Sequence, residues 1–101
     1  MTEATIRRKA IKKLTEEGWV WWYPSRTRWK KKKDIFGVFD LVVVKEYMTK
    51  FIQLTTREHL AERETKVRKF LSENNLKIGA EVWGWNKKVK DFVVIKILSA
   101  L

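Results

Sequence analysis

The chain has 101 residues, with 23 lysine and arginine residues against 12 aspartate and glutamate residues, and a net charge of +11. This length supports one domain, residues 1–101. Cysteine is absent, which excludes disulfide bonds and cysteine-ligated zinc, and no apolar run approaches the roughly 20 residues that cross a membrane. The charged start, MTEATIRRKAIKKL, lacks the apolar core of a secretory signal, so we expect a cytoplasmic protein.

The positive charge is concentrated at the start of the chain. Residues 1–33 hold 11 basic residues and three acids, a net charge of +8, whereas residues 34–101 carry +3. A concentrated basic surface favours a polyanionic partner, and nucleic acid, above all DNA, is the partner we expect. The alternative is a basic surface that only keeps the protein in solution.

The first third of the chain predicts a helix, a strand and a basic loop. Over residues 4–17 the apolar side chains share one helical face, and Gly18 suits the position after a helix end. The aromatic residues 19–23 predict a strand. Residues 24–33 predict a loop in which Trp29 either stacks on unpaired bases or folds back on the sheet. The nucleic-acid-binding residues we expect are Arg26, Arg28, Trp29, Lys30, Lys31, Lys32, Lys33, Arg7, Arg8 and Lys12.

The rest of the chain predicts a sheet with a second helix. Residues 35–45 are apolar on both faces, which is typical of a central strand, and residues 50–55 predict the next strand. Thr55 and Glu58 have the spacing of a capping box, so we expect a helix over residues 55–74. Two strands follow, over 80–88 and 91–98. The predicted order is α-β-β-β-α-β-β, an α/β domain with a central mixed sheet flanked by helices.

A buried acid needs a partner, and Asp40 lies within an almost unbroken apolar run. Strand alternation places Asp40 on one face of its strand, and Gln53 and Thr55 on one face of the next. These three side chains converge if the two strands are neighbours, and Asp34 could add a second carboxylate. In the following helix Arg63 falls within the apolar arc and needs an anion. Asp40 therefore either forms a buried ion pair with Arg63 or holds a metal ion.

The element order and these residues resemble the PD-(D/E)XK nuclease superfamily, which has the restriction-endonuclease-like fold and includes the archaeal Holliday-junction resolvases. Asp40 matches the aspartate of that motif by position, and Gln53-Leu54-Thr55 falls where (D/E)-X-K is expected. The segments DIFGVFD, FIQLTT and VWGW are similar to small viral or phage members with a degenerate motif, for which host-cell cytoplasm is the implied location. The resemblance covers residues 4–98.

The resemblance implies a DNA endonuclease or junction-resolving enzyme that uses Mg²⁺ or Mn²⁺. The implied metal ligands are Asp40, Gln53 and Asp34, and the implied catalytic residues are Asp40, Gln53, Thr55, Lys66 and Arg63. It also implies a homodimer, with VWGW or the last strand as the interface. Trp83 and Trp85 are otherwise expected to pack on the sheet or, less in keeping with their pattern, to stack on bases.

The motif departs from the family pattern at three places, which leaves alternatives open. Gln53 is neutral where an acid is usual, Thr55 carries no charge where a lysine is usual, and the acids near the first helix are Glu16 and Glu17 at its end. We expect Lys66 to reach a bound phosphate and Arg63 to be mainly structural. The alternatives are an inactive protein of this fold that binds DNA or RNA, and a structural or assembly protein.

Overall fold

The computed structural model describes residues 2–24 and 34–97, and most of the predicted basic loop lies outside it. Along the chain the order is a helix, three strands, a second helix and two strands. Their bounds are α1 Glu3–Glu16, β1 Val20–Trp22, β2 Leu41–Lys45, β3 Met48–Thr56, a 3-10 turn Arg57–His59, α2 Leu60–Glu73, β4 Gly79–Asn86 and β5 Asp91–Ile97.

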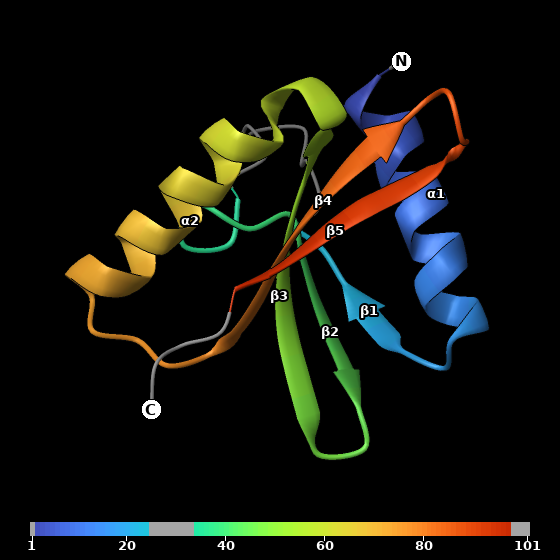
Figure 1. Cartoon of the computed structure of the whole chain (residues 1–101). Helices are drawn as coiled ribbons and strands as arrows, with labels where there is room; N and C mark the ends of the chain where they lie inside the picture. The colour runs from blue at the N-terminus through green and yellow to red at the C-terminus, as the bar shows by residue number, and fades with distance from the viewer. Residues whose placement is uncertain (1, 25–33, 98–101) are drawn as a thin grey trace, which may run out of the picture.

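The five strands form one mixed sheet in the order β1-β2-β3-β4-β5. Neighbouring strands are antiparallel except β3 and β4, which are parallel because α2 carries the chain back between them. In the described residues this is a single α/β domain with two helices (Figure 1). The predicted α/β class, with a mixed sheet flanked by helices, is confirmed.

The two helices cover opposite faces of the sheet (Figure 1). α1 buries its apolar stripe with Leu41, Ile52 and Trp83, whereas α2 buries its own with residues such as Val82. Because Val82 and Trp83 are adjacent in β4, they point to opposite faces. The sheet therefore has an apolar core on each side. In the described part of the chain, neither helix is long and apolar enough to span a membrane.

Local hydrogen bonds fix both ends of α1. The Thr2 hydroxyl accepts from the Thr5 N–H at 3.2 Å and caps the start. At the other end Gly18 has a φ of 89°, and the Trp19 N–H donates to the Leu14 carbonyl at 2.9 Å. This is the Schellman pattern, which places a residue of left-handed conformation directly after the helix. The predicted role of Gly18 is confirmed.

The strand predicted over residues 35–45 is wrong in its first half. The chain folds into a tight turn over residues 34–39, closed by Ile35 and Phe39, and β2 begins only at Leu41. Phe36 and Gly37 have φ angles of 56° and 72°. A left-handed pair ends an extended strand, and glycine is the residue that most readily permits it. Phe36, Val38 and Asp40 are therefore not successive residues of one strand face.

The helix predicted from residue 55 also begins later than expected. β3 continues through Thr56, because Thr55 and Thr56 pair with Gly84 and Trp85 of β4. A 3-10 turn follows, and α2 begins at Leu60. The expected capping box between Thr55 and Glu58 is wrong. The pKa of Glu58 is lowered mainly by a hydrogen bond from its own backbone N–H, and less by one with the Thr56 side chain.

The two tryptophans of β4 pack within the domain. Trp83 is buried, and its Nε1 donates to Glu81 Oε1 at 3.0 Å, while Lys50 Nζ lies 3.1 Å from Glu81 Oε2. Trp85 is half-buried, with its ring centroid 5.1 Å from that of Phe92. Sheet packing of both rings is confirmed. VWGW cannot form the strand edge of a dimer interface, because β4 is paired on both sides, by β3 and β5.

Gly84, between the two tryptophans, allows α2 to approach the sheet. A Cβ built on Gly84 would lie 2.5 Å from Leu60 Cγ. We predict that Gly84→Ala lowers the free energy of unfolding by about 1–3 kcal/mol through overpacking. Leu60→Ala alone should cost about 2–5 kcal/mol by leaving a cavity. The double variant should lose less unfolding free energy than the two single losses added together, as measured by urea denaturation. Strict additivity would contradict this contact.

Candidate functional site

A pocket of about 270 Å³ lies where the start of α1, the turn before β2, the end of β3 and the start of α2 meet. We call it the Asp40 pocket. It brings together five residues that the sequence singles out, Asp34, Asp40, Gln53, Thr55 and Arg63, and His59 lies beside them. Glu3, Ile6, Leu54 and Thr56 complete its lining. The predicted convergence of Asp40, Gln53 and Thr55 is confirmed.

Asp40 is 4% exposed and is held by β3. Its Oδ2 accepts the Leu54 N–H at 2.7 Å and Gln53 Nε2 at 2.9 Å, while its own N–H donates to the Ile52 carbonyl at 2.8 Å. β2 pairs with β3 only from Leu41 onwards, opposite Ile52. The N–H of Leu54 faces that side of β3 but has no strand beside it. The Asp40 carboxylate takes the place of the missing backbone acceptor.

The amide of Gln53 is oriented by two acceptors. Its Nε2 donates to Asp40 Oδ2 and, at 3.0 Å, to the Leu54 carbonyl. Because an amide carries its donors on nitrogen and its acceptor on oxygen, this places Oε1 on the other side of the group. Gln53 is 4% exposed, and its Oε1 is buried without a hydrogen-bond partner in the described residues. A buried acceptor in this state is unusual, because buried polar groups are nearly always hydrogen-bonded.

Asp34 reaches the pocket because the chain turns back on itself. The Ile35 N–H donates to the Phe39 carbonyl at 2.7 Å, and the Gly37 N–H donates to the Asp34 carbonyl at 2.9 Å. This closed turn brings Asp34 to the same pocket as Asp40, although the two are six positions apart. The predicted second carboxylate is thus present, but through a turn and not through the entrance of a strand.

The structure places Arg63 and Lys66 differently from what the sequence predicts. Arg63 lines the pocket, is half-buried, and has a buried Nε without a hydrogen-bond partner in the described residues. No hydrogen bond or ion pair in residues 2–24 and 34–97 joins it to Asp40, so the expected buried pair is wrong. Lys66 is exposed and is not part of the pocket lining. Asp40 is satisfied by amide donors, which leaves the Arg63 guanidinium directed at the pocket.

Two other pocket residues differ in exposure. Thr55 is buried and carries no charge. His59 is exposed and precedes α2 without capping it through its side chain. Its Nδ1 lies 3.5 Å from Glu62 Oε2, an ion pair when the imidazole is protonated.

Glu3 is the pocket residue that the sequence did not indicate. We expected the acids of the first helix at its end, Glu16 and Glu17, but Glu3 in the first turn lines the Asp40 pocket. An acid in a first turn is commonly explained by the helix dipole. The sequence therefore gave no reason to place Glu3 in a pocket, because its position there depends on how α1 crosses the sheet.

The oxygen atoms of the Asp40 pocket fit a hard divalent cation. Mg²⁺ binds through one or two carboxylates and retains several waters. The Asp40 carboxylate and the unpartnered Gln53 Oε1 supply such ligands, and Asp34 and Glu3 border the same space. In the described residues no three His, Cys, Asp or Glu side chains are grouped closely enough to hold a metal ion. The donor set therefore suits a largely hydrated ion.

Of the residues predicted to bind nucleic acid, three lie on α1. Arg7 stacks over the Tyr23 ring at 4.5 Å, and Arg8 and Lys12 are exposed. The remaining seven fall outside the described residues, so their role stays a prediction: Arg26, Arg28, Trp29, Lys30, Lys31, Lys32 and Lys33.

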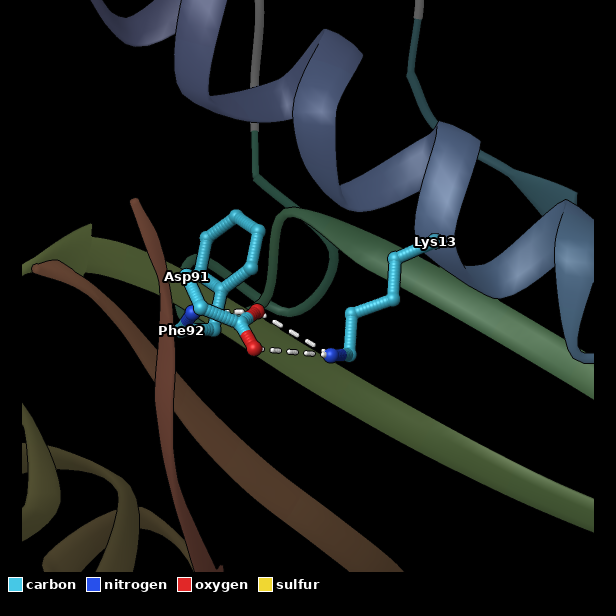
Figure 2. A network of polar contacts seen from close by, with 3 residues as sticks. All are labelled: Lys13, Asp91 and Phe92. Carbon is cyan, nitrogen blue, oxygen red and sulfur yellow. Dashed lines mark hydrogen bonds and ion pairs between the residues drawn. The ribbon is translucent and has the colours of Figure 1, made fainter. Parts of the chain in front are cut away.

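A second pocket, of about 250 Å³, lies between α1 and the β4–β5 hairpin, and we call it the lysine pocket. Lys9, Lys12, Lys13 and Lys90 line it. Figure 2 shows Lys13 Nζ reaching both oxygens of Asp91, at 3.0 and 3.4 Å. The Phe92 N–H donates to the Asp91 carboxylate at 2.8 Å. This bond, and to a smaller extent the one from Lys13, lowers the pKa of Asp91.

Comparison with known proteins gives no relative: the chain matches no family model, no curated protein and no solved structure.

The bonds to Asp40 predict a stability effect that separates charge from hydrogen bonding. Asp40→Ala leaves the Leu54 N–H without an acceptor and should lower the free energy of unfolding by about 1–3 kcal/mol. Asp40→Asn retains an acceptor oxygen and should lose less. Asp34→Asn removes a charge from the same pocket without touching β3, and is the control. Chemical denaturation of all three variants tests the order; equal losses in Asp40→Ala and Asp34→Asn would refute the strand-end role.

Proposed function

We propose that this chain is a nucleic-acid-binding protein of the restriction-endonuclease-like fold that cleaves DNA with a divalent cation at the Asp40 pocket. One observation carries the proposal. Gln53 and Arg63 both line the pocket, and each has one buried polar atom without a partner in the described residues, the Oε1 acceptor and the Nε donor. Buried polar groups are nearly always satisfied. A phosphate bound together with a cation would satisfy both.

The order of the elements supports this fold. α1 precedes an antiparallel meander, and α2 then returns the chain to β4, parallel to β3. Asp40 precedes β2, and Gln53-Leu54-Thr55 lies in β3. These are the positions that the aspartate and the (D/E)-X-K motif occupy in the superfamily that the sequence resembles. The fold assignment rests on this agreement of position.

The side chains divide the chemistry between them. Asp40 and Gln53 supply oxygen ligands, and their mutual hydrogen bond fixes both before a substrate arrives. A bound Mg²⁺ or Mn²⁺ ion would polarise the phosphate and lower the pKa of a bound water. Arg63 presents a guanidinium to the phosphate oxygens, where negative charge grows in the transition state. Arg63 thus takes the part that Thr55, without a charge, cannot perform.

A second candidate function is nucleic-acid binding without cleavage. The specific observation in its favour is Thr55, a buried neutral side chain at the position of the motif lysine. An ordered water could also satisfy the Gln53 and Arg63 atoms, since polar pockets of this size hold water. In this case the net charge of +11 would account for affinity through phosphate contacts. The homodimer implied by the resemblance stays a prediction under either function.

We predict that DNA cleavage requires Mg²⁺ or Mn²⁺ and depends on Asp40. Asp40→Asn should reduce the rate by more than about 100-fold, the most that loss of an outer-shell partner usually costs. The measurement is nicking and cutting of duplex, branched and single-stranded substrates, with and without EDTA. Glu73→Gln, which removes an exposed acid at the end of α2, is the control and should cut normally.

Two outcomes would revise this proposal. Equal cleavage by Asp40→Asn and the parent would show that the site is elsewhere. If the parent cuts none of these substrates but binds them, the non-cleaving function replaces the enzyme.

The positions of Arg63 and Lys66 predict opposite results for two similar substitutions. Arg63→Ala should reduce cleavage, or DNA affinity if there is no cleavage, with little change in melting temperature, because Arg63 makes no ion pair with Asp40. Lys66→Ala should match the parent in all three measurements, because Lys66 is outside the pocket. A silent Arg63→Ala, or a large loss of stability in it, would contradict the role assigned to the guanidinium.

A further inference from the structure

The lysine pocket brings together charges that repel one another. On α1, Lys12 and Lys13 lie three and four positions after Lys9, spacings at which like charges destabilise a helix. Lys90 is added from the β4–β5 turn. Against four lysines the lining holds two acids, Glu16 and Asp91, so the pocket carries a net charge of +2.

Two of these lysines are held in place by the protein itself. Lys9 Nζ lies 4.9 Å from the centroid of the Trp85 ring, a cation–π contact. Lys13 is fixed by both oxygens of Asp91, which in turn accepts the Phe92 N–H (Figure 2). These contacts restrict the movement of the Lys9 and Lys13 side chains in the pocket lining.

The other two lysines are available to a ligand. Lys12 and Lys90 make no hydrogen bond, ion pair or ring contact in the described part of the chain, and both are exposed. Lys90 also has a φ of 53°, a conformation that glycine or asparagine adopts at lower cost.

We propose that the lysine pocket binds a backbone phosphate of the nucleic acid, with Lys12 and Lys90 contacting the anion directly. Lysine binds phosphate as a point charge, and Lys9, held on the Trp85 ring, adds to the local positive potential. Glu16 lies at the end of the lining that is nearest the C-terminus of α1, three positions beyond Lys13. The anion therefore lies towards Lys12 and Lys90.

This inference rests on the proposed function for the identity of its ligand. α1 contributes Glu3 to the Asp40 pocket and Lys12 to the lysine pocket. Nine residues of helix separate them by about 13.5 Å along the axis. At one phosphate per about 3.4 Å of duplex axis on each strand, that distance is about four nucleotides. The lysine pocket would hold the strand a few nucleotides from the phosphate in the Asp40 pocket.

The test compares two double variants with the same change in charge. Lys12→Gln with Lys90→Gln removes the two direct contacts, and glutamine leaves the left-handed φ at residue 90 as costly as before. Lys66→Gln with Lys77→Gln removes two exposed lysines elsewhere. DNA affinity is measured by fluorescence anisotropy from low to high salt. The plot of log K against log salt should become shallower by about 2 in the first variant relative to the second.

A second measurement identifies the site directly. Inorganic pyrophosphate titrated into the ¹⁵N-labelled protein should shift the amides of residues 9–13 and 87–91 and the Trp85 indole, and the pocket variant should lose these shifts. Equal salt slopes in the two double variants overturn the inference and leave the proposed function intact. Pyrophosphate shifts that the variant retains also overturn it. A parent that binds no DNA but shows the localised shifts refutes the proposed function and supports the phosphate site.

Discussion

The hydrogen bond from the Leu54 N–H to the Asp40 carboxylate, 2.7 Å long, is the contact on which the site depends. β3 is longer than β2, so its last residues leave the antiparallel ladder before they leave the sheet. A carboxylate at the first position outside β2 completes the hydrogen bonding that the shorter strand cannot. The same bond fixes the side chain beside Gln53. A structural role and a ligand-binding role for Asp40 are therefore compatible. The hydrogen bonds that allow the carboxylate to be buried also hold it in the orientation that a ligand would need.

This arrangement also explains why Arg63 is directed at the pocket. A buried carboxylate that lacked amide donors would need a cation, and Arg63 was the natural candidate in the sequence. Because β3 supplies two donors to Asp40, the guanidinium is not required for the fold at that point. An arginine that is half-buried without an acid is costly in isolation. Under the proposed function, a bound phosphate would offset this cost.

The sequence predicts those parts of the fold that depend on local pattern, and fails where two signals compete. Asp40 meets Gln53 because β2 and β3 are neighbours, which is the condition on which the predicted convergence depended. The turn at residues 34–39 was missed because an apolar run outweighed Gly37, the residue that permits the left-handed conformation there. The start of α2 was misplaced because Thr55 and Glu58 have capping spacing, yet the β3–β4 ladder retains Thr55 and Thr56. Glu3 and Lys90 reach their pockets through tertiary packing, which no local pattern encodes.

The first helix connects the two pockets, and its sequence shows how one element can serve both. The buried stripe of Ile6, Ala10 and Leu14 fixes the rotation of α1 on the sheet. Once that rotation is fixed, Glu3 must face one end of the sheet, and Lys9 and Lys13 must face β4 and β5. The apolar stripe of α1 therefore determines where each of its basic residues lies. A change in the core that rotated α1 would move both pockets together, whereas a change in the β4–β5 turn would move only the lysine pocket.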